Sequence, residues 1–143
     1  MKKYTILLLL IIGGLVSCKK QQAQDANPVE KISIDDATLV SKGSLTSTSL
    51  KLTGVAKIYL QKNGKYILAL EQIKMNSNSD LSVYFSYAPS LSSTSIKLFS
   101  FKKIDGQMYY ELPAGVAGTS FPFLLIQGDI SQLPDGIAEL KKA

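Results

Sequence analysis

The sequence predicts an all-β protein, specifically an antiparallel β-sandwich, and two patterns indicate this class. From about residue 50 to residue 140, short runs alternate between apolar and polar side chains. A period of two is that of a strand with one buried face. Gly, Pro, Asn and Ser separate these runs at short intervals, as turns between antiparallel strands require. A sandwich or a barrel satisfies both patterns, and we favour the sandwich.

The clearest strand pair lies around Asn63-Gly64. One face of the first strand consists of Leu50, Leu52, Gly54, Ala56, Ile58 and Leu60. The opposite face consists of the intervening residues Lys51, Thr53, Val55, Lys57, Tyr59 and Gln61. Asn-Gly between two alternating runs is the strongest short signal for a β-hairpin. We therefore expect Tyr66–Ile73 to be the returning strand.

Five further strands follow, which gives about seven to nine in an immunoglobulin-like or related sandwich. Their predicted ranges are Leu81–Ser86, Ile96–Phe101, Met108–Leu112, Phe121–Gln127 and Ile137–Leu140. Pro89 and Ser90–Ser95 predict a loop, and Asp105-Gly106 predicts a turn. At the end of the chain, Gly136–Lys142 also fits a helical turn.

The predicted core has two layers. Leu81, Val83 and Phe85 share one face of their strand because they alternate with polar residues. We expect Phe123 and Leu125 to supply the opposing layer.

The N-terminus has the features of an export signal that ends in a lipid anchor. Lys2 and Lys3 precede a short apolar run, and Leu15-Val16-Ser17-Cys18 resembles the lipobox of bacterial lipoproteins, with Cys18 as the sole cysteine. The two alternatives are an uncleaved membrane anchor and a signal peptide cut elsewhere. The apolar segment, 5–16, is shorter than the roughly 20 residues that a spanning helix needs, which disfavours the anchor. A cut elsewhere would leave Cys18 as a free thiol. We expect residues 1–17 to be a lipoprotein signal peptide and Cys18 to be lipidated.

Residues 18–37 are expected to be the lipidated cysteine with a flexible tether, and residues 38–143 the β-sandwich domain. The segment from Lys19 to Pro28 is polar and lacks bulky apolar residues, which is typical of a spacer. Val29–Ile34 is an alternative ordered strand. The residue after the cysteine is Lys19 and not the Asp that retains some bacterial lipoproteins at the inner membrane. We therefore favour the outer membrane of the cell envelope, with the protein attached to the membrane through its lipid.

The composition excludes most catalytic and cofactor sites. The chain has no His and no Trp, and all 16 of its basic residues are Lys. Without His there is no Ser-His or Cys-His pair, no imidazole metal ligand and no histidine for haem. Without Arg there is no planar guanidinium group to bind phosphate or guanine through two parallel hydrogen bonds. Removal of the signal peptide takes away Lys2 and Lys3 and lowers the net charge from +5 to +3. We expect a non-catalytic protein without cofactor, metal site or nucleic-acid partner.

Four residues are candidates for ligand binding: Asp80, Tyr84, Tyr109 and Tyr110. Asn76, Asn78 and Asp80 place oxygen atoms close together, as calcium prefers, although Asp80 as a turn cap explains the same pattern. Tyr109 and Tyr110 are adjacent and must point to opposite faces of a strand. Exposed tyrosines suit contacts with an envelope protein or a glycan, and core packing is the alternative for each.

Four short motifs follow one another along the chain: Gly54-Val55-Ala56, Asp80-Leu81-Ser82-Val83-Tyr84, Gly106-Gln107-Met108-Tyr109-Tyr110-Glu111-Leu112-Pro113 and Gly136-Ile137-Ala138-Glu139-Leu140. Their order resembles that of the electron-transfer DM-thirteen domain, a small β-sandwich family of extracellular proteins. The resemblance implies the sandwich fold over about a hundred residues, nearly all of the folded part. It also implies a redox or electron-transfer accessory role as the alternative to a binding role. The family's Trp-Cys pair is replaced here by Gln127 and Gly128, so the cysteine that underlies this role is missing.

Overall fold

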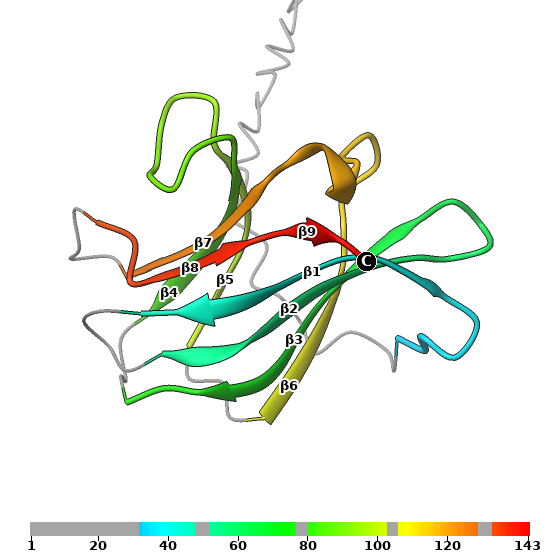
Figure 1. Ribbon diagram of the computed structural model, residues 1–143, viewed down its shortest axis with the longest axis horizontal. Coiled ribbons are helices and arrows are strands. Elements are labelled where there is room, and N and C mark those ends of the chain that lie inside the picture. The colour runs from blue at the N-terminus through cyan, green and yellow to red at the C-terminus, as the bar shows by residue number, and fades with distance from the viewer. Residues whose placement is uncertain (1–31, 48–51, 77–79, 103–105, 129–132) are drawn as a thin grey trace, which may run out of the picture.

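The computed structural model describes residues 32–47, 52–76, 80–102, 106–128 and 133–143 (Figure 1). Within these ranges the chain forms strands and one short 3₁₀ turn, η1 (Gly118–Ser120). The strands are β1 (Thr38–Thr46), β2 (Thr53–Leu60), β3 (Tyr66–Lys74), β4 (Leu81–Ser86), β5 (Ile96–Phe101), β6 (Gly106–Glu111), β7 (Phe123–Gly128), β8 (Gly136–Glu139) and β9 (Lys141–Lys142). The described part contains no helix long and apolar enough to cross a membrane.

The all-β prediction is confirmed, and every pairing between strands is antiparallel. The strands form one sheet in the order β5-β4-β7-β8-β1-β2-β3-β6, and β9 pairs with β1 beyond the end of β8. Figure 1 shows this sheet curled around its interior, with β4, β5 and β7 on one side and β2, β3 and β6 on the other. The C-terminal segment is a strand, as predicted, and not a helical turn.

The two edges of the sheet, β5 and β6, are consecutive in the chain but do not pair with each other. β5 pairs with β4 and β6 pairs with β3, while the predicted turn residue Asp105 lies outside the described residues. Two contacts made by Tyr110 connect these edges. The hydroxyl of Tyr110 on β6 donates a hydrogen bond to the Leu98 carbonyl on β5 at 3.0 Å, and the rings of Phe99 and Tyr110 are 4.3 Å apart. We call these three residues the seam.

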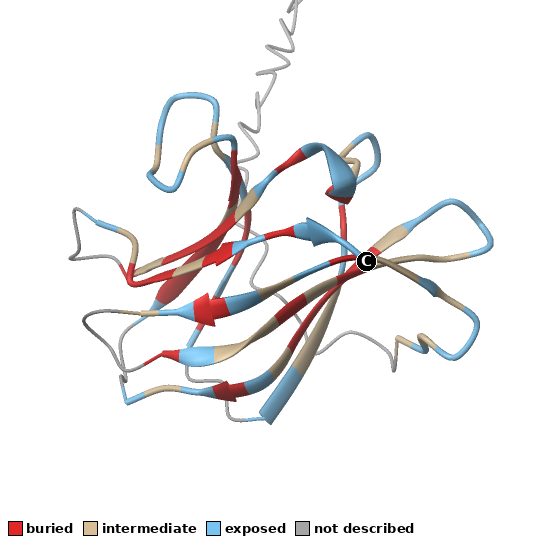
Figure 2. Cartoon of the chain, viewed as in Figure 1, coloured by how far each residue is buried: buried red, intermediate tan, exposed pale blue. Residues whose placement is uncertain are grey.

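The interior is filled from both halves of the curled sheet, and buried residues recur along its strands (Figure 2). Leu81, Val83 and Phe85 are fully buried on the core face of β4, as predicted. The Phe85 ring stacks on that of Phe121 with centroids 5.1 Å apart and planes 7° apart.

The predicted face of β7 is wrong. Leu124 and Ile126 join the core, whereas Phe123 is half-buried and Leu125 lies outside the core cluster. Tyr84 and Ile137 are the cross-strand neighbours of Leu125 on the outer face. Because all four residues from 123 to 126 are apolar, alternation does not identify the core face of this strand.

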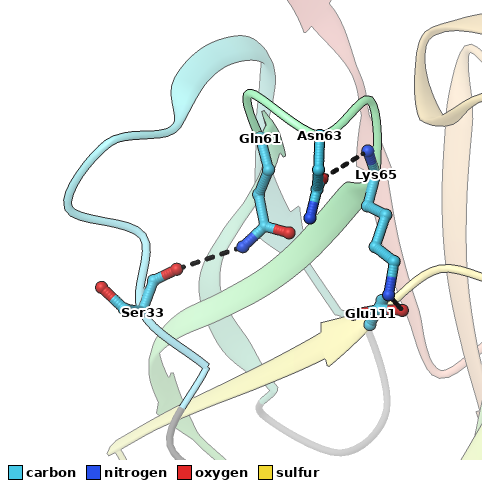
Figure 3. A network of polar contacts seen from close by, with 5 residues as sticks. All are labelled: Ser33, Gln61, Asn63, Lys65 and Glu111. Atoms are coloured by element: carbon cyan, nitrogen blue, oxygen red, sulfur yellow. Dashed lines mark hydrogen bonds and ion pairs between the residues drawn. The ribbon is translucent and has the colours of Figure 1, made fainter.

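The hairpin predicted at Asn63-Gly64 joins β2 to β3. The Gly64 N–H donates to the Gln61 carbonyl at 3.0 Å, and Gly64 has a φ of +83°. A type I turn followed by a left-handed glycine is a common three-residue hairpin loop. The Asn63 side chain accepts a hydrogen bond from the Lys65 N–H at 3.0 Å (Figure 3). The loop sets Leu60 opposite Tyr66 and so fixes the register of both strands.

The described residues before β1, 32–37, do not form a strand. Residues 32–34 of the alternative strand Val29–Ile34 have no strand pairing, and 29–31 lie outside the described residues, as does Cys18. Gln61 of the hairpin donates a side-chain hydrogen bond to the Ser33 carbonyl at 3.3 Å (Figure 3). This end of the expected tether therefore contacts the β2–β3 hairpin.

Candidate functional site

Four half-buried polar or aromatic side chains gather on the outer face of β2, β3 and β6. Their register follows from the hairpin: Lys57 lies opposite Ala69, and Ala69 lies opposite Tyr109. Tyr59 and Glu71 stand two residues away on the same faces of their strands. We call Lys57, Tyr59, Glu71 and Tyr109 the tyrosine face.

An ion pair fixes the centre of the tyrosine face. Lys57 Nζ lies 2.6 Å from Glu71 Oε2, and the two side chains are only 28% and 19% exposed. The Tyr59 hydroxyl donates to Glu71 Oε1 at 3.5 Å. The hydrogen bond to Glu71 raises the pKa of Lys57, and burial, followed by the nearby Glu71 charge, raises the pKa of Tyr59. At neutral pH Lys57 is therefore an ammonium ion and Tyr59 a phenol, and both are hydrogen-bond donors.

Removing the charge of Glu71 should reduce stability in a pH-dependent way. A lysine whose pKa is raised by folding stabilises the protein below its ordinary pKa of 10.5 and loses this contribution as pH rises through the folded pKa. We expect Glu71→Gln to cost about 0.5–1 kcal/mol at neutral pH, with the difference from wild type kept up to about pH 10 and shrinking as the pH rises above the ordinary lysine pKa of 10.5. Urea unfolding across that range measures it.

The matched control is Glu139→Gln, because Glu139 and Lys141 form an exposed pair at 3.5 Å. This variant should stay within about 0.5 kcal/mol of wild type at every pH. A pH-independent difference for Glu71→Gln would contradict a contribution from the Lys57 charge.

The structure separates the four predicted ligand-binding residues. Tyr109 belongs to the tyrosine face. Tyr84 is half-buried on the outer face of β4, where it lies opposite Lys97 and Leu125 in the other half of the sheet. Asp80 is exposed just before β4. Tyr110 points into the interior and belongs to the seam, so its hydroxyl serves the core.

The oxygen-rich loop before Asp80 is only partly described. Asn76 is exposed, whereas Asn78 lies outside the described residues. Within the described ranges, no group of three or more His, Cys, Asp and Glu side chains is placed to hold a metal ion.

Gly128, which replaces the cysteine of the resembled family, packs against a buried carboxylate. Its N–H donates to Asp135 Oδ2 at 2.6 Å, and Asp135 is 5% exposed. A Cβ at this position would lie 3.1 Å from that oxygen and 3.4 Å from Leu81 Cδ2. Asp135 was missed because nothing in the sequence distinguishes it from the other acids in loops. A side chain at position 128 would therefore require the Asp135 carboxylate to shift by a few tenths of an ångström.

We expect the purified, metal-free protein to be colourless and redox-silent. A thiol role needs a thiolate, and Gly128 has no side chain to supply one. Absorption spectroscopy and protein-film voltammetry measure this. Reversible electron uptake would contradict it and favour the redox role.

Sequence patterns missed the partnership of Glu71 with Lys57. Alternation placed Lys57 and Tyr59 on the polar face of their strand but gave no pairing across strands. The Asn63-Gly64 hairpin is the signal that could have found it, since a three-residue loop aligns Lys57 with Ala69 and sets Glu71 on the diagonal.

No protein-family model, curated protein or solved structure matches this chain.

Proposed function

We propose that this chain is a lipid-anchored, non-catalytic binding module of the bacterial cell envelope. The tyrosine face is the observation that carries the proposal. Tyrosine offers a rigid amphipathic contact surface with little loss of side-chain entropy on binding. Lys57, Tyr59 and Glu71 already hold one another in place, so a partner that contacts them has little ordering to do.

A binding role fits the protonation states of this face better than catalysis does. The pKa values of Lys57 and Tyr59 are both raised. A nucleophilic lysine or a general base near neutral pH requires a lowered pKa instead. Lys57 has further N–H donors besides the one bound to Glu71, and the Tyr59 oxygen, whose O–H is donated to Glu71, can accept a hydrogen bond from a bound group.

Attachment to the membrane through Cys18 places this face in the envelope. The polar tether expected over residues 18–37 gives the domain reach, and two or more acyl chains provide stable anchoring. The outer membrane is the proposed location.

We further propose a sandwich-like arrangement related to the DM-thirteen domain. The four motifs of that resemblance lie on or beside β2, β4, β6 and β8, and one core cluster joins residues from both halves of the curled sheet. In this proposal the two halves of the one curled sheet correspond to the two layers of the expected sandwich.

Photocrosslinking in native envelopes tests the binding role. Benzoylphenylalanine in place of Tyr109 should give an adduct of defined mass. The same group in place of Lys97, on the outer face of the other half of the sheet, should not. No adduct from position 109, or the same adducts from both positions, would contradict the proposal.

A further inference from the structure

Three lysines lie in register across adjacent strands, and one of them, Lys57, belongs to the tyrosine face. Lys42 on β1 lies opposite Lys57 on β2 and also opposite Lys141 on β9. Like charges directly opposite each other destabilise a sheet. This row therefore concentrates positive charge at a cost that a bound anion would relieve.

The three ammonium groups differ in how strongly they are paired with a carboxylate. Lys57 is held by Glu71 at 2.6 Å. Lys141 lies 3.5 Å from Glu139, but both side chains are mostly exposed, at 73% and 60%, and such pairs are weak. Lys42 is exposed and has no ion pair within the part of the chain that the structure describes. Lys42 and Lys141 are thus neighbouring cations available to a ligand.

A groove of about 560 Å³ lies beside these two lysines, which is within the range of small-molecule sites. Phe123 and Ile137 give it an apolar side, and Ser44 and Glu139 add a hydroxyl and a carboxylate. Phe123 is half-buried and lies opposite Glu139 across β7 and β8.

We infer that this groove binds an acidic sugar unit of a glycan. Its carboxylate lies between Lys42 and Lys141, its ring packs against Phe123, and its hydroxyl groups donate to Glu139. The inference rests on the proposed binding role and gives its ligand a chemical class.

The mixed charges of the groove favour a sugar over other anions. Glu139 would repel an inorganic anion or a lipid phosphate, but it accepts hydrogen bonds from hydroxyl groups. An acidic peptide finds no free edge on β1, β7 or β8, because each of these strands is paired on both sides.

Isothermal titration of the full chain with digalacturonate, at low salt, tests the inference. We expect saturable binding by wild type, about tenfold weaker binding by Lys42→Gln and by Lys141→Gln, and loss of affinity as salt increases. Lys97→Gln removes the same charge from β5 and should bind as wild type does. Maltose, a neutral disaccharide, should bind at least tenfold more weakly than digalacturonate.

Four outcomes would overturn the inference: no binding of digalacturonate, unchanged affinity in Lys42→Gln, equal binding of maltose, or hexaglutamate binding with the same affinity and lysine dependence. The titration and the Tyr109 crosslink fail independently. Lysine-dependent digalacturonate binding without a crosslink would retain the groove and remove the tyrosine face. A crosslink without digalacturonate binding would do the reverse.

Discussion

Replacing Phe85 with alanine is expected to lower the free energy of unfolding by about 3–5 kcal/mol. The Phe85 side chain is fully buried on the core face of β4 and stacks on Phe121 at 5.1 Å. Truncation removes this contact and leaves a cavity that the surrounding strands fill only in part. Urea unfolding of wild type and Phe85→Ala measures the loss.

Phe123→Ala is the matched control, because it removes the same side chain from the half-buried outer face of β7. It should cost about 1–2 kcal/mol, since less apolar area leaves water when this residue folds. A loss below about 1 kcal/mol for Phe85→Ala, or a larger loss for Phe123→Ala, would show that the core face is misassigned.

Cys18→Ser should abolish acylation and release the protein from the membrane. Each buried methylene contributes about 0.8 kcal/mol to membrane affinity, so the loss of two or more acyl chains removes nearly all of it. Metabolic labelling with an alkynyl fatty acid, fractionation and intact-mass analysis measure the change. The lipoprotein-specific cleavage should be blocked as well.

Ser17→Ala provides the control for processing. It keeps a small residue before the cysteine and should retain both cleavage and labelling. An unmodified thiol at residue 18 in the wild-type protein extracted from the envelope would end the hypothesis.

Local patterns predicted the elements whose two faces differ in polarity. β2 and β4 alternate apolar and polar residues, and Asn63-Gly64 specifies its own hairpin. β7 was predicted as a strand, but its core face could not be identified because both of its faces are covered: Ile126 lies in the core, and Leu125 is equally buried outside the core cluster. No pattern in the sequence identified β1 as a strand, although it pairs with β2, β8 and β9.

Long-range pairing was the other limit. The strands β5 and β6 are neighbours in sequence, yet β6 pairs with β3, and alternation carries no information about such choices. The tyrosine face could not be predicted for the same reason. The contact between Lys57 and Glu71 depends on the register of β2 against β3, which residue type alone does not give. Alternation does not tell which of Tyr109 and Tyr110 faces the core, and the structure shows that it is Tyr110.

The seam also bears on the order in which the chain folds. Only residues 102–105 separate β5 from β6, so bringing Phe99 and Tyr110 together requires the closure of a short loop. Pairing of β6 with β3 closes a much longer stretch that contains β4 and β5, and contacts of large sequence separation form more slowly. We therefore expect the contact between these two aromatic rings to form before β6 pairs with β3.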